Sequence, residues 1–482
     1  MSVPNMRLPF FWAEVINAGQ LGTQAQRGML IGQATSATYV GVPRLLSSAE
    51  HAASLFGRGS PLHRMAMRAF KAHPGGLWYS LGIADADAST ASAWTVTFVC
   101  SEATEAGTIR FWLGSDKIDL GVVKGDDLAD LAERLADLLP SASDYPVTAT
   151  HDGGVATLTF RSKGTVGNAL RVARDTSMDL PAGVTSVTIA HSVTGATDPT
   201  LDATITAMAP DRYHKIALYL DSLGEDLAAD MDDRWGYLRH QYGHAFSAVA
   251  GTAASGDVAG YTAMLADMVS AASPYAHWTS AKLPSTCRAP AYEVAAALAA
   301  VAMRSDEADP GLKIGTLVLS DCRGPESDDF TPAQKNQLLL YGGTTFSSSG
   351  GYLVIDQCNT TRWSNADGSR NNAYLDAPKY WLAEYAVDSL HSTMSAQYAR
   401  CRLVSDSDGQ IPPLCATPSA VAASIRSWYR GLCNRGLAQD PDTFDAAITV
   451  TRPEDDRNRL DAYVPAHLAD NFEILAPTLA FT

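Results

Sequence analysis

One stretch, residues 330–363, constrains the fold more than any other, because it specifies a helix and a hairpin in immediate succession. Thr331 is placed to cap a helix that begins at Pro332, since a threonine side chain can accept from the first free amides and proline needs no donor there. Leu338 to Leu340 give this helix an apolar face, and the pair Gly342 and Gly343 ends it.

An extended run follows this helix, at residues 344–347, and a glycine turn at Gly350 and Gly351 separates it from a second strand. That strand is β-branched and aromatic, and consists of Tyr352, Leu353, Val354 and Ile355. A helix and a two-stranded hairpin cannot bury their own apolar faces, so the unit needs further strands. Where those strands come from is the main question that the sequence raises.

The rest of the chain predicts a multidomain protein that mixes α/β and α+β folds, since 482 residues exceed one ordinary core. Strands alternate with helices in residues 28–89 and 197–324, which favours one discontinuous α/β domain with a mostly parallel sheet. Residues 90–196 consist of short alternating strands and one amphipathic helix, which indicates an inserted β-rich domain. Residues 325–482 are expected to form a C-terminal α+β domain, and residues 1–27 an N-terminal arm.

Both ends of the chain are apolar and strand-like, with a C-terminal arm expected from about residue 465. The apolar side chains of the two arms are Leu8, Phe10, Phe11, Trp12, Val15, Phe472, Ile474, Leu475, Leu479 and Phe481. Each arm either folds back onto its own domain or adds a strand to a neighbouring subunit, where backbone hydrogen bonds give strength. The residues alone favour neither alternative.

The net charge, the hydropathy and the cysteine content argue against nucleic-acid-binding, membrane-inserted and exported proteins. The formal net charge is -16, so long-range electrostatics oppose binding to a nucleic-acid backbone. No stretch is apolar enough to span a membrane, and no charged-then-apolar leader opens the sequence, so we expect neither membrane insertion nor export by a cleaved signal. The seven cysteines are scattered without a C-x-x-C pair, which is typical of free thiols in a reducing cytoplasm.

The sequence motifs for catalysis or metal binding are weak. His240 and His244 have the spacing of a zinc-protease pair, but the position that needs a catalytic glutamate is Gln241. An acidic run between Glu225 and Asp233 lacks the glycine of a calcium loop and is typical of a solvated helix face. We therefore expect no catalytic, cofactor-binding or metal-binding residues.

Taken in order, several motifs resemble the contractile tail sheath proteins of phages, in the branch of Mu-like phages. The matching stretches are RLPFFWAEV, GTQAQRGMLIGQ, AASLFGRGSPLHRM, SKGTVGNALRV, WGYLRHQYGHAF, FTPAQKNQLLLYGGTTF, NNAYLDAPKYW and NRLDAYVP. They span nearly the whole chain, and the weakest match lies in residues 90–160. The chain departs from the family in the hairpin of residues 344–355, which lacks the family's arginine-rich character, and in its unusual cysteines.

The resemblance implies a structural subunit of a virion, assembled in the host cytoplasm, that polymerises helically around a tail tube and contracts to drive the tube through a cell envelope. It implies partners in other copies of the chain, the tail tube protein, and the baseplate and tail terminator proteins, with no cofactor. It also implies that Met6 to Val15 and Asn471 to Phe481 are strands donated to a neighbour, and that the sheet containing Tyr352 to Ile355 receives them. The alternative is a virion-associated metal- or carboxylate-dependent hydrolase based on His240, His244 and the acidic helix.

Overall fold

The computed structural model describes residues 26–201, 206–208, 211–235, 243–251, 258–270, 277–325, 329–365, 367–406, 413–454 and 456–472. These residues form a mixed α and β protein of several units, as the sequence predicts. Strands of both halves of the expected discontinuous domain meet in a single nine-stranded sheet, which we call the central sheet.

The central sheet has the order β14-β16-β15-β13-β12-β11-β1-β3-β2. Its strands are β1 (Arg27–Gln33), β2 (Arg44–Leu45), β3 (Leu77–Ile83), β11 (Lys215–Leu218), β12 (His244–Ala250), β13 (Trp278–Leu283), β14 (Val318–Arg323), β15 (Gly343–Ser349) and β16 (Tyr352–Gln357). The strands from β15 to β3 run parallel, and both edges of the sheet are antiparallel.

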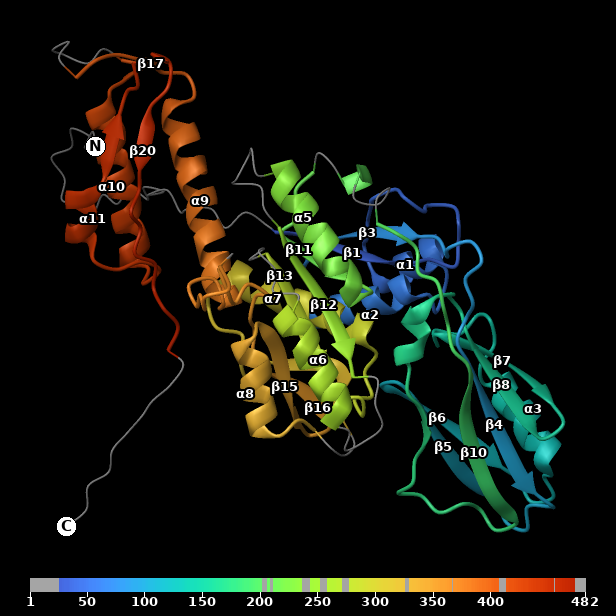
Figure 1. Cartoon of the computed structure of the whole chain (residues 1–482). Helices are drawn as coiled ribbons and strands as arrows, with labels where there is room; N and C mark the ends of the chain where they lie inside the picture. Colours follow the sequence, from blue (N-terminus) through green and yellow to red (C-terminus); the bar gives the residue numbers. More distant parts are fainter. Residues whose placement is uncertain are drawn as a thin grey trace, which may run out of the picture.

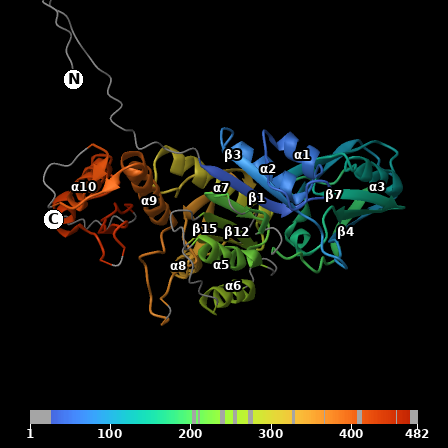
Figure 2. The same cartoon turned by 90° about the horizontal axis from the view of Figure 1, so that it is seen from above.

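Helices cover both faces of the central sheet (Figure 2). One face carries α1 (Ala49–Phe56), α2 (Pro61–Ala72) and α7 (Ala291–Ala308), and the other carries α5 (Gly224–Trp235), α6 (Val258–Ser270) and α8 (Pro332–Leu340). A short 3-10 helix, Asp221–Leu223, follows β11, and a second one, Thr165–Ala169, lies in the inserted segment between β3 and β11. The alanine-rich α7 is buried along most of its length, because small side chains let it lie close to the strands beneath it.

Residues 93–193, which we call the inserted unit, leave the central sheet after β3 and return before β11. They form the strands β4 (Ala93–Cys100), β5 (Gly107–Leu113), β6 (Asp116–Val122), β7 (Val147–Asp152), β8 (Val155–Phe160), β9 (Val172–Arg174) and β10 (Val184–Val193), with the helix α3 (Leu128–Asp137). The strands pair as one sheet in the order β10-β4-β8-β7 and a second in the order β6-β5-β9. Asp127 caps α3 in a capping box with Asp130.

Residues 377–472, the C-terminal unit, lie at the opposite end of the molecule from the inserted unit (Figure 1). Their elements are α9 (Ala377–Tyr398), β17 (Arg402–Leu403), β18 (Cys415–Ala416), α10 (Pro418–Asn434), α11 (Pro441–Ala447), β19 (Thr449–Thr451) and β20 (Asp461–Tyr463). This unit has its own hydrophobic core, and α9 belongs to two cores at once: Trp381 packs in the central core, whereas Leu382 and Ala386 pack in the C-terminal core.

The helix and hairpin of residues 330–363 obtain their neighbouring strands from their own chain, contrary to our expectation. Strand β15 pairs with the parallel β13 through Ser280↔Gly343, and β16 lies between β15 and β14. The central sheet therefore continues past residue 324, where we expected a boundary with the C-terminal domain.

Candidate assembly site

The C-terminal unit carries a small sheet that is incomplete by itself. Strands β19 and β20 pair antiparallel over three residues each, with Val450 opposite Ala462. Among the described residues, neither strand has a second neighbour, so the outer edge of each leaves backbone donors and acceptors free. A two-stranded sheet of this length is marginal in water, and added strands would stabilise it.

A rigid platform holds this small sheet. The rings of Tyr429 on α10 and Phe444 on α11 stack with their centres 3.7 Å apart, and Val450 packs against the same core. The Tyr429 hydroxyl donates to the Gln439 carbonyl at 2.7 Å and accepts from the His467 backbone N–H at 2.9 Å. These bonds fix the chain that follows β20 against α10, so the edge keeps one orientation.

An exposed aromatic side chain marks the small sheet. Tyr463 at the end of β20 is 65% exposed, whereas the exposed Phe472 follows Asn471, near the C-terminal end of α7. When a partner covers an aromatic side chain this accessible, its apolar surface is removed from water, which favours binding. The small sheet therefore offers both free strand edges and apolar surface to a further strand.

The roots of both arms lie close together, at the C-terminal end of α7. The Gln26 backbone N–H donates to Glu307 Oε1 at 2.9 Å, and its side-chain amide donates to Asp306 Oδ2 at 2.6 Å. Asn471 Nδ2 donates to the Gly311 carbonyl at 3.0 Å, and the Gly311 N–H in turn donates to Asp306 at 3.3 Å. The two ends of the described chain thus leave the body at neighbouring points.

The predicted arm residues fall mostly outside the described part of the chain. This holds for Leu8, Phe10, Phe11, Trp12, Val15, Ile474, Leu475, Leu479 and Phe481. Phe472 is described, and its side chain is exposed and therefore accessible to a partner. The donated-strand role of these residues stays a prediction.

The predicted acceptor residues lie inside the central sheet. Leu353 and Ile355 are each about 1% exposed, and Tyr352 and Val354 pair with β14 on one side and with β15 on the other. Because both edges of β16 are occupied, a strand can join this strand only by displacing one of its own chain. The sequence predicts extended segments at residues 446–452 and 459–464, but it does not pair them. A charged turn between two short β-branched or aromatic runs was the available signal.

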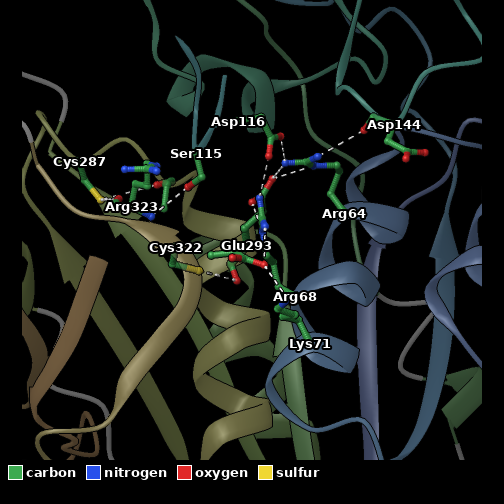
Figure 3. Close-up of polar contacts among 12 residues, drawn as sticks. Arg64, Arg68, Lys71, Ser115, Asp116, Asp144, Cys287, Glu293, Cys322 and Arg323 are labelled. Atoms are coloured by element: carbon green, nitrogen blue, oxygen red, sulfur yellow. Dashed lines mark hydrogen bonds and ion pairs between the residues drawn. The ribbon is translucent and has the colours of Figure 1, made fainter. Parts of the chain in front are cut away.

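A buried cluster of charges joins the inserted unit to the central sheet (Figure 3). Arg64 and Arg68 on α2 bind Glu293 on α7, with Nε to carboxylate distances of 2.8 Å and 2.6 Å, and Arg64 also binds Asp116 at the start of β6. Glu293 is fully buried. Burial opposes the charge of Arg64, but Glu293 and Asp116 outweigh it and raise the pKa of this guanidinium.

This charge cluster is a structural joint, because its carboxylates are held by arginines that cannot lose their protons. Next to it, Ser115 Oγ accepts from the Arg323 N–H at 3.0 Å, which links the inserted unit to β14 as well. The sequence signal for the cluster is Glu293 itself, a lone charge within the apolar run AYEVAAALAA.

The histidine pair does not form a site in the described chain. His240 lies outside the described residues, and His244 is fully buried in β12, where Nε2 is 2.7 Å from Thr279 Oγ1. Burial lowers the pKa of His244 well below its ordinary value, so this ring stays neutral. The described residues contain no group of three or more His, Cys, Asp or Glu side chains placed to hold a metal ion. Nor does any helix in the described ranges have the length and apolar character needed to cross a membrane.

Comparison with known proteins extends this picture. No family model matches the chain. The chain is 27% identical to the Mu-like prophage FluMu tail sheath protein of Haemophilus influenzae, over 99% of its own length and 97% of the relative's.

Two solved structures are similar at a lower level. A sheath tail protein from Desulfitobacterium hafniense has 14% identity and a TM-score of 0.48, with 96% of each chain covered. The helical sheath of the anti-feeding prophage in its contracted state has 13% identity and a TM-score of 0.46, with 100% of this chain and 99% of that chain covered. At these TM-scores the structural likeness adds nothing to the sequence comparison. The relative from Haemophilus influenzae confirms the resemblance that the motifs predict: along almost its entire length, this chain is similar to a tail sheath protein of a Mu-like prophage.

Proposed function

We propose that this chain is the structural subunit of a contractile tail sheath. The observation that carries the proposal is the 27% identity to a tail sheath protein over 99% of the chain, since a likeness of that extent leaves no large part of the chain for another task. The chain polymerises helically around a tail tube and contracts, which drives the tube through the envelope of the target cell. We propose no catalytic role, because His244 is buried and neutral.

The proposal extends to the finer architecture. The inserted unit forms the outer domain, and the C-terminal unit forms the assembly domain. Strands donated by the N-terminal and C-terminal arms of neighbouring subunits complete the sheet of β19 and β20, rather than the hairpin of β15 and β16. This location is supported by the two unpaired edges in the C-terminal unit and by the exposure of Tyr463.

Contraction in this scheme uses no nucleotide. The extended sleeve is a metastable packing, and subunits rotate into a lower-energy lattice once the baseplate releases them. The donated strands keep neighbouring subunits connected while the packing between subunit bodies changes. The chain thus acts in the phage tail, together with a tube protein, a baseplate and a terminator, after assembly in the host cytoplasm.

Two N-terminal truncations of the purified chain test the donated-strand role. Deletion of residues 1–15 removes the apolar arm, and we expect a folded monomer that forms no polymer in sedimentation and negative-stain microscopy. Deletion of residues 1–5 is the matched control, because it leaves Met6 to Val15 in place and assembly should be normal. Normal assembly by the longer deletion would show that the N-terminal arm is not a donated strand.

A further inference from the structure

The inserted unit contains a four-stranded sheet, β10-β4-β8-β7, whose two edge strands differ in how they are protected. At the β7 edge, the Ala149 backbone N–H donates to the Leu139 carbonyl at 3.3 Å, so the chain that follows α3 occupies part of the outer side of β7. β7 also ends at the exposed Asp152, and a charged side chain at an edge opposes further strand pairing. The fold itself therefore protects this edge.

The opposite edge of this sheet, β10, is open. It is ten residues long, and its register with β4 is regular from Ser186 to His191. In the part of the chain that the structure describes, no second strand pairs with β10, which lies on the side of the sheet away from α3 (Figure 1). Thr188 and residues 190–193 are exposed. The outer side of β10 therefore presents a row of backbone N–H and C=O groups that another strand could bind.

The sequence of β10 lacks the usual protection of an exposed edge. It reads VTSVTIAHSV, in which β-branched residues predominate, and it contains no lysine, no proline and no acidic residue. The two irregularities in its register lie at its ends, between Val184 and Ser186 and between His191 and Val193. The residues from 186 to 191 thus keep the regular geometry that pairing with a further strand needs.

The sheet face next to β10 carries no charge either. Thr95 and Thr97 of β4 alternate with buried apolar side chains and therefore point to the outer face. Ala190 and Thr188 of β10 lie opposite these two threonines. Because the chain has a formal net charge of -16, two copies repel each other over most of their surface. An uncharged edge beside an uncharged face is where two copies can approach with the least repulsion.

We propose that β10 pairs antiparallel with β10 of a second copy, around a two-fold axis, and so forms a dimer of the unassembled chain. A strand that pairs antiparallel with its own copy meets the requirement of two-fold symmetry that both copies contribute the same residues. Threonines are favourable partners across such a pair. The contact consists of one strand from each copy, so the dimer is weak and dissociates on dilution.

The dimer goes beyond the proposed sheath function and does not rest on it. A two-fold pair is closed, whereas a helical sleeve needs head-to-tail contacts between copies that all point the same way. The pairing of β10 with β10 therefore belongs to the free protein. In a sheath subunit, this pair has to separate before the two copies can enter the same sleeve.

Sedimentation velocity of the full-length chain tests this proposal, at concentrations at which no polymer sediments. Ala190→Lys places a charge on the open edge, and the matched control Thr150→Lys places the same charge on the protected strand β7, where Thr150 is also exposed. We expect the parent chain and the control to form a species of twice the mass of one chain, in a fraction that rises with concentration. Ala190→Lys should raise the dissociation constant about tenfold or more, because it adds like charges on both sides of the pair.

A parent chain that shows no dimer at any concentration would overturn the proposal, and so would an Ala190→Lys chain that dimerises as well as the control. Hydrogen exchange is a second measurement that needs no substitution. Amides of residues 184–193 should exchange more slowly in the dimer than in diluted protein, whereas those of residues 147–152 should not change. Protection that appears elsewhere but not in β10 would place the dimer contact on another surface. Neither measurement needs a polymer, so failure of the sheath proposal would leave both outcomes unchanged.

Discussion

Replacement of Glu293 by glutamine should weaken the joint between the inserted unit and the central sheet far more than an ordinary surface substitution. Glu293 is fully buried and binds two guanidinium groups, at 2.7 Å from Arg64 Nη2 and 2.6 Å from Arg68 Nε. Both arginine side chains are themselves only 2% and 6% exposed. Glutamine keeps the shape of the side chain, but it removes the charge and replaces one of the two acceptor oxygens with an NH2 group that cannot accept from an arginine.

The expected loss in the free energy of unfolding is about 3–5 kcal/mol, because breaking one side of a buried ion pair leaves the other charge buried without compensation. Asp116 limits the loss, since it also binds both arginines. The matched control is Glu50→Gln. Glu50 is 68% exposed and pairs with Arg58 at the surface, so its replacement should cost about 0–1 kcal/mol.

Urea unfolding of the monomer, followed by circular dichroism at a concentration below assembly, measures both losses. A double-mutant cycle with Arg68→Met should give a coupling energy of about 0.5–3 kcal/mol between positions 68 and 293. If Glu293→Gln lost no more than Glu50→Gln, the buried cluster would not be a structural joint, and the reasoning from burial and charge would be refuted.

Three further predictions concern pH, thiols and salt. Because the pKa of Glu384 is raised to about 7 from 4.5, the native state holds this proton more tightly, and its contribution to stability is lost as pH rises from about 4.5 to 7. Relative to the parent chain, Glu384→Gln should therefore gain up to about 3 kcal/mol in the free energy of unfolding between pH 4.5 and 8. If the difference between the urea midpoints of the two chains stayed constant over this range, the pKa shift would be contradicted. N-ethylmaleimide should modify the native chain only at the three partly exposed thiols, and labelling of the buried ones without denaturant would contradict their burial. The partly exposed thiols are Cys401, Cys415 and Cys433, and the buried ones are Cys100, Cys287, Cys322 and Cys358. Since the net charge is -16, raising the salt concentration should increase the sedimenting polymer fraction by screening repulsion, whereas a steady fall would count against acidic self-repulsion.

Local signals in the sequence predicted elements well wherever a cap or a breaker defined them. Thr331 caps α8 in a box with Gln334, and α8 begins at Pro332 as expected. Ser60 caps α2, which begins at Pro61, and Gly57 ends α1 with a φ of 95°. In these places the deciding interactions lie within one helical turn of the residue that signals them.

Strand pairing between distant segments could not be predicted in the same way. The pairing of β13 with β15 joins Ser280 to Gly343, and nothing near either residue specifies the other. The continuous apolar run of residues 352–355 indicates a buried strand, but not whether the neighbouring strand belongs to this chain or to another. We therefore expected the wrong source of strands for this hairpin.

In the candidate assembly site, too, local elements could be predicted and long-range contacts could not. Extended segments near β19 and β20 were predictable from their composition, but α11 replaces part of the expected strand, because Pro441 opens a helical turn there. Glu293 was a visible signal as a lone charge in an apolar run, but its partners could not be predicted, since it meets Arg64 across 229 positions of sequence. Burial of a charge depends on partners that only the fold brings together.

Microscopy of the purified full-length chain tests the central claim most directly. If the chain is a sheath subunit whose open sheet is completed by other copies, concentrated protein should form tubes or rings in negative stain, with identical subunits in helical or ring symmetry. Protein that stays a monodisperse monomer at every concentration and salt condition tested would contradict the account.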